Sequence, residues 1–231
     1  MKKFIFVALF IATTAGLVAG EYQPTEGWPY LYDQFTPAIV YYDNGKAESA
    51  DINVHLLNNS LHFVDGELIK VVHDPHHIDS VVCENNDVLL YKGNLYILRV
   101  AATPHIVIGT TSEVDLNSLT ESNGAYGNPT TTGATQNIAS FRDHGNIAAQ
   151  RYQEMIADRH NTRTLSTTDR IVLVINDREI CQANKRGVNS ILDKNQKNAF
   201  KAFLKENKIK WKETADLLLV AQFLESILVF E

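Results

Sequence analysis

The chain has 231 residues, of which 21 are basic and 27 acidic, giving a formal net charge of −6. An acidic surface argues against nucleic acid or anionic membrane as a partner, because both select for clustered lysine and arginine. The length fits one or two domains and allows a hydrophobic core that needs no disulfide or metal to hold it together.

Residues 1–20 carry the pattern of a secretory signal peptide. Two lysines precede an apolar stretch, and Val18-Ala19-Gly20 places small residues three and one positions before the expected cut at Glu21. The apolar stretch is shorter than the ~20 residues that a membrane-spanning helix needs. Leu17–Gly20 resembles a bacterial lipobox, but Glu21 stands where lipid attachment needs a cysteine. We therefore expect an exported protein, periplasmic or secreted, with no lipid anchor and no transmembrane helix.

The mature chain is expected to be a single α+β domain over residues 21–231. Residues 21–36 are rich in proline and aromatic residues without clear periodicity, which predicts an extended arm packed on the core. In residues 37–114, short β-branched and aromatic runs alternate with turn residues, which indicates an antiparallel β-meander. Asn44-Gly45 and Asp65-Gly66 are hairpin signals, and the Asn-Gly pair suits a turn in which both positions need a positive φ.

Residues 115–145 consist mainly of Asn, Ser, Thr, Gly and Ala, which predicts a long polar loop in the middle of the domain. The remainder, residues 146–231, is expected to contain a helix, a hairpin and C-terminal helices. The first helix would have one apolar face, made of Ile147, Tyr152, Met155 and Ile156.

The hairpin is predicted over Arg170–Ala183, with its turn at Asn176-Asp177. A capping-box signature at Asp193 indicates the start of one C-terminal helix, and periodic apolar residues from Leu217 onward predict another. We expect these helices to pack on the sheet, because each is too short to be stable alone. Basic residues concentrate between Lys185 and Lys212, which is the ordinary pattern of a solvated helix face.

The chain has two cysteines, Cys83 and Cys181. Export would permit a disulfide between them, and in the chain-entropy model a loop of about a hundred residues stabilises by ~4–5 kcal/mol. The alternative is two buried free thiols, which behave as small hydrophobic side chains. The sequence leaves both open, because bridging depends on the distance between the Cα atoms.

The densest cluster of metal-ligating residue types is His73-Asp74-Pro75-His76-His77. Imidazole and carboxylate groups suit zinc, and Pro75 keeps the segment non-helical, so His73, His76 and His77 would lie on a turn between two strands. The spacing matches no established zinc signature. The alternative is an exposed polar turn with three surface histidines.

His55 and His62 lie on neighbouring predicted strands. They could face each other across a hairpin and form part of a site. The simpler interpretation places both on the solvated face of the sheet.

Several catalytic signatures are absent from the sequence, including the nucleophile elbow, the zinc-protease helix, the phosphate loop and the dinucleotide fingerprint. Neither cysteine has the local pattern of a thiol protease. These absences lower the expectation of an enzyme, although a site can assemble from residues far apart in the chain.

Some segments resemble a group of uncharacterised exported proteins of Bacteroidota-type bacteria. They are Trp28–Tyr32, Val40–Gly45, Ile52–Leu57, Asn123–Gly127 and Phe200–Trp211. The resemblance implies a periplasmic or secreted location, and it implies no activity, cofactor or functional residue.

The sequence thus favours a non-catalytic binding or structural module of the cell envelope or secretome, whose partner would be an envelope protein or a glycan. One alternative is a divalent-metal-binding protein that uses His73, His76 and His77. The other is a hydrolase with a dispersed site.

Overall fold

The computed structural model describes residues 22–115, 150–159 and 162–230. The predicted signal peptide and nearly all of the predicted polar loop lie outside these ranges. Within the described ranges, no helix is long and apolar enough to cross a membrane.

One antiparallel sheet of eleven strands, in the order β11-β10-β8-β7-β6-β5-β1-β2-β3-β4-β9, runs through the described residues. Its strands are β1 (Thr36–Tyr42), β2 (Ala47–His55), β3 (Ser60–Asp65), β4 (Leu68–Val71), β5 (Ile78–Cys83), β6 (Val88–Lys92), β7 (Leu95–Ala102), β8 (Ile106–Val114), β9 (Gln150–Arg151), β10 (Thr167–Ile175) and β11 (Glu179–Gln182). With helices at one end, the architecture is α+β.

The strand order departs from a single continuous meander between β4 and β5, and again at β9, which pairs with β4 while β10 pairs with β8. β1 to β4 pair in chain order, and so do β5 to β8, but β5 lies beside β1 and not beside β4. The His73–His77 turn therefore carries the chain back from one edge of the first four strands to the other. Its backbone is tied there, because the N–H of Asp43 donates to the His77 carbonyl at 3.0 Å.

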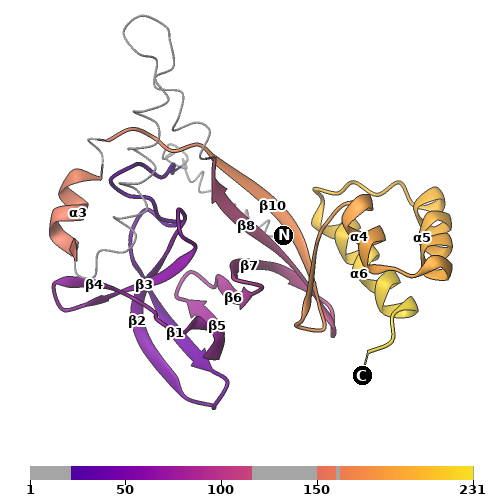
Figure 1. Cartoon of the computed structure of the whole chain (residues 1–231), viewed down its shortest axis with the longest axis horizontal. Helices are drawn as coiled ribbons and strands as arrows, with labels where there is room; N and C mark the ends of the chain where they lie inside the picture. Colours follow the sequence, from indigo (N-terminus) through magenta and orange to yellow (C-terminus); the bar gives the residue numbers. More distant parts are fainter. Residues whose placement is uncertain (1–21, 116–149, 160–161, 231) are drawn as a thin grey trace, which may run out of the picture.

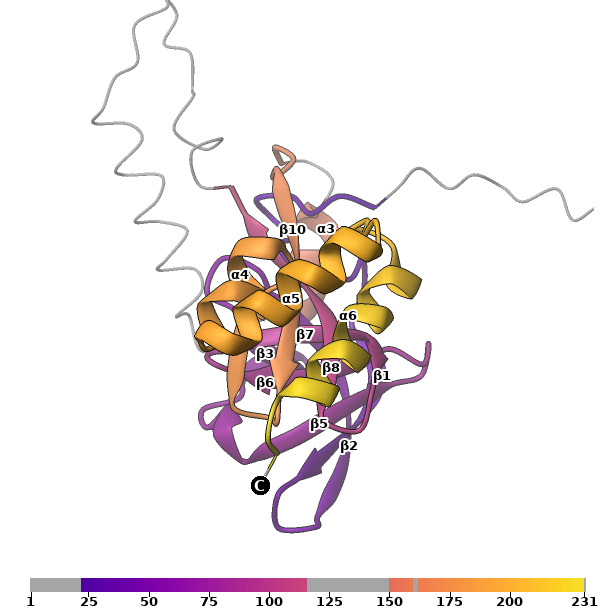
Figure 2. The same ribbon diagram turned by 90° about the vertical axis from the view of Figure 1, so that its right-hand side faces the viewer.

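Three helices gather at the end of the molecule opposite β1–β4, next to the β10–β11 hairpin (Figures 1 and 2). They are α4 (Lys185–Ile191), α5 (Lys194–Glu206) and α6 (Thr214–Ile227). α5 begins with the capping box that the sequence indicated, in which Asp193 accepts from the Asn195 and Gln196 N–H groups. One core cluster joins the helices to the sheet, and it includes Ile106, Ile108, Leu173, Cys181, Val188, Phe200, Leu217 and Leu224.

Two more clusters occupy opposite faces of the first strands. On one face, alternate residues of β1, β2, β3 and β5 are buried, among them Val40, Ile52, Leu61 and Val81. On the other face of β2–β4, the arm packs through Trp28, Tyr30 and Phe35, together with α3 (Tyr152–Asp158). The expected extended arm and short helix are therefore both present; Ile147 lies outside the described residues.

The turns show where local sequence sets the backbone. Asn176 and Asp177 both have positive φ, 48° and 58°, as a two-residue type I′ hairpin turn requires. At Asn44-Gly45 only Gly45 is left-handed, with φ 78°, and its N–H donates to the Tyr42 carbonyl. The expectation of positive φ at both positions is wrong there, because the loop beyond Tyr41 is longer than two residues and ends in a glycine bulge.

Candidate functional site

A buried pair of histidines connects β2 and β3. His55 is 3 % exposed and His62 is 5 % exposed, and their rings stack with centroids 5.0 Å apart. Tyr30 from the arm stands edge-on to both rings. The interpretation that placed these histidines on a solvated face is therefore wrong, because the arm covers that face.

A chain of hydrogen bonds runs from the arm through His62 to the β2–β3 turn. The Tyr30 hydroxyl lies 3.0 Å from His62 Nδ1, and the Ser60 hydroxyl lies 2.8 Å from His62 Nε2. The Ser60 hydroxyl donates to Asn58 Oδ1 at 2.6 Å. Four side chains from three segments thus form one polar network, and a serine and a histidine lie within reach of each other.

The direction of these bonds decides what the network can do. Ser60 has a single proton, and because that proton goes to Asn58, His62 Nε2 must donate to Ser60 Oγ. His62 Nδ1 is then the acceptor for the Tyr30 hydroxyl. A histidine that donates to a serine cannot act as its general base in this arrangement, so the network differs from that of a serine hydrolase.

Burial keeps both imidazoles neutral near pH 7. Loss of solvation lowers the pKa of His55 to about 4, although a hydrogen bond with Asn58 partly opposes the change. Burial and the neighbouring His55 lower the pKa of His62 to about 3. Burial also raises the pKa of the Tyr30 hydroxyl. His55 Nδ1 is buried and has no hydrogen-bond partner among the described residues.

Asn53 fastens the arm beside this network. Its side chain is fully buried, and Oδ1 accepts from the Tyr32 and Val54 N–H groups at 3.0 and 2.9 Å. Its Nδ2 donates to the Tyr32 and Gln34 carbonyls at 2.9 and 3.1 Å. Because the amide makes four bonds to the backbone, it holds the arm as a sheet neighbour would.

The predicted metal ligands lie on an exposed turn that contains a short 3₁₀ helix, Pro75–His77. His77 Nδ1 lies 2.8 Å from Asp43 Oδ2, and this contact, with Asp74 also nearby, raises the pKa of His77. His76 stands edge-on to Tyr91. Within the described ranges, no three His, Cys, Asp or Glu residues are placed to hold a metal. The zinc hypothesis thus stays a prediction, tested by calorimetric titration of the wild type and His76→Ala.

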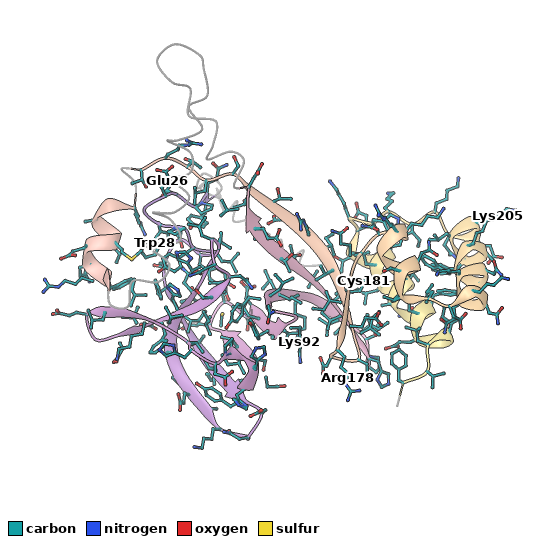
Figure 3. The ribbon with its side chains drawn as sticks, viewed as in Figure 1. Glu26, Trp28, Lys92, Arg178, Cys181 and Lys205 are labelled. Carbon is teal, nitrogen blue, oxygen red and sulfur yellow. The ribbon has the colours of Figure 1, made fainter. Side chains whose placement is uncertain are left out.

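Both cysteines are free and buried. Cys83 belongs to the cluster of the first strands, whereas Cys181 lies between the β10–β11 hairpin and the helices (Figure 3). Burial raises the pKa of Cys83 to about 11 and that of Cys181 to about 12. The disulfide alternative is therefore wrong, because each thiol packs in a separate core; the free-thiol alternative is the one observed.

The exposed apolar side chains of β1 form the other candidate. Ala38 and Val40 are buried, so the alternation of the strand places Ile39 and Tyr41 on its opposite face, where they are 40 % and 39 % exposed. In the register of the sheet, Ile39 lies beside half-buried Val82 of β5. We call Ile39, Tyr41 and Val82 the β1 strip.

Tyr30, Asn58 and Ser60 were not expected as members of a polar network. Tyr30 fills the core as part of the arm, and there its hydroxyl also donates to a buried histidine. No family model matches the chain, and comparisons with curated proteins and with solved structures find no similar protein.

Proposed function

We propose that this chain is an exported, non-catalytic binding module of the cell envelope or secretome, and that it holds a protein partner on the β1 strip. Exposed aromatic and aliphatic side chains gathered on one face are typical of protein contact surfaces. The observation that supports this proposal most directly is that Ile39 and Tyr41, both large, lie two residues apart on a face of β1 where each is about 40 % exposed.

The neighbours of the strip support a protein partner over a glycan. Ser49 and Ala47 flank it on β2, and Ser80 flanks it on β5. These small side chains leave a flat surface on which a second apolar surface can pack closely. A sugar site would normally combine an aromatic ring with several convergent polar groups.

A capture experiment on an envelope extract tests the proposal. Ile39→Asp with Tyr41→Asp should abolish capture of the partner that the wild type retains, because it places two charges in the contact. Val100→Asp is the matched control, since Val100 is 48 % exposed on β7, three strands away in the sheet order. Equal loss with both variants, or no loss with either, would contradict a role for the strip.

The contact between Ser60 and His62 is the one specific observation in favour of the alternative function, a hydrolase. A turnover screen against peptides, esters and glycans separates the two functions. Robust activity that Ser60→Ala removes would establish the hydrolase and end the proposal of a binding module. We expect no such activity, because the Ser60 proton is directed to Asn58.

A further inference from the structure

The lysines of α5 form a row. Lys194, Lys197, Lys201 and Lys205 follow one another at intervals of three or four residues, and all four are exposed. At 100° and 1.5 Å per residue they fall within an arc of roughly 80° and along roughly 16 Å of the helix. We call these four residues the α5 lysine row.

The row belongs to a strongly basic part of an otherwise acidic protein. Residues 185–212 contain nine basic and two acidic residues, a net charge of +7, whereas the rest of the chain contains 12 basic and 25 acidic residues, a net charge of −13. α5 lies at the extreme end of the molecule, with Lys205 at its outer margin (Figures 1 and 3). The basic charge is therefore concentrated on α4, α5 and the segment that follows α5.

No lysine of the row belongs to an ion pair in the described part of the chain. The ion pairs within 4.0 Å there involve Lys70, Lys92, Arg151, Arg170 and His77, and none includes a lysine of α5. Asp193 uses its carboxylate to cap the helix. Like charges three and four residues apart slightly destabilise a helix, so the row does not serve the stability of α5.

The row also takes no part in the core. α5 is anchored by Phe200, which is fully buried and stacks on Phe203 and Phe223. Since these rings are engaged with the helical core, α5 offers no exposed aromatic platform for nucleic acid bases. The row has lysines and no arginine, so it lacks the bidentate fork that favours phosphate recognition.

We propose that the α5 lysine row binds an acidic peptide segment of a partner protein. A run of carboxylates about 16 Å long matches the length of the row. A compact segment touches only the basic end, whereas a long duplex or a membrane extends over the acidic remainder of the molecule and is repelled by it. This surface is independent of the β1 strip, so the two proposals stand or fall separately.

Binding of a fluorescein-labelled decamer of glutamate, followed by fluorescence anisotropy on the full mature chain, tests the proposal. The wild type should bind at 25 mM salt and weaken at 150 mM. The double variant Lys197→Glu with Lys201→Glu should bind about tenfold more weakly or worse, because two charges within a Debye length are reversed. Lys197→Gln with Lys201→Gln should show an intermediate loss.

The matched control is Lys46→Glu with Lys70→Glu, which changes the net charge by the same amount at the sheet end. It should stay within twofold of the wild type. Equal weakening of both Glu pairs would overturn the proposal, because net charge alone would then explain binding. No binding by the wild type at 25 mM salt would also overturn it, as would tighter binding of a 20-base-pair duplex or of anionic phosphatidylglycerol vesicles under the same conditions.

Discussion

The buried histidine pair makes stability depend on pH in a window that carboxylates barely reach. The pKa of His55 and that of His62 are lowered from 6.5 by burial, so the native state favours neutral rings. Their contribution to stability is complete above pH 6.5 and is lost as the pH falls from 6.5 toward 4. In this interval the histidines bind protons in the unfolded chain but not in the folded chain, so a falling pH favours unfolding.

The magnitude follows from the pKa difference. A decrease in the pKa of His55 from 6.5 to about 4 lowers the free energy of unfolding by about 3 kcal/mol at pH 4. His62, whose pKa is about 3, loses a similar amount over the same interval. The two together are a large part of the ~5–15 kcal/mol that stabilises an ordinary domain. His77 acts in the opposite direction, since Asp43 raises its pKa, but its exposure to solvent limits the effect on stability.

The test is urea unfolding at several pH values between 6.5 and 4. His62→Gln is the informative variant, because glutamine offers an acceptor to Tyr30 and a donor to Ser60 but does not titrate. The free energy of unfolding should change by about 1.4 kcal/mol less per pH unit than in the wild type. His76→Gln, on the exposed turn, is the control. A His62→Gln slope equal to that of the wild type would refute the reasoning.

Three further predictions concern stability and the thiols. Asn53→Asp should lower the free energy of unfolding in urea by ~2–4 kcal/mol, because a carboxylate oxygen would face the Tyr32 and Gln34 carbonyls in place of an N–H donor. A loss below ~1 kcal/mol would contradict the role of Asn53 in holding the arm. Gly109→Ala should destabilise by ~1–3 kcal/mol and lower the melting temperature, since its Cβ would lie 2.9 Å from the Leu98 carbonyl oxygen. Ellman's reagent should find two thiols in unfolded protein and almost none in native protein, and a mass unchanged by reduction should accompany this result.

Features that depend on neighbouring residues could be predicted from the sequence. The turn at Asn176-Asp177 and the cap at Asp193 are set by backbone conformation and by hydrogen bonds that span a few residues. The arm was expected because its aromatic side chains have no strand or helix period and still need burial.

Features that depend on distant segments could not be predicted. Alternation in β2 and β3 shows that His55 and His62 share a face of the sheet. That face is shielded from solvent only because the arm, more than twenty residues earlier in the chain, packs on it. The pairing of β5 with β1 could not be predicted either, because nothing in the local sequence of β5 shows whether it pairs with β1 or with β4. The sequence showed the basic tract that includes α5. Only the three-dimensional structure showed that the four lysines of α5 are exposed and take part in no ion pair among the described residues.

The pairing of β5 with β1 has a consequence for the order of events during folding. A chain that has emerged only as far as Val72 can form β1 to β4, but the free edge of β1 then exposes the unpaired backbone groups of a central strand. Such an edge is a template for pairing with another chain. The edge of β1 closes when Ile78–Cys83 arrives and pairs with it. Nascent chains stalled in the His73–His77 turn should therefore pair with other chains through β1 more readily than chains that have passed Cys83.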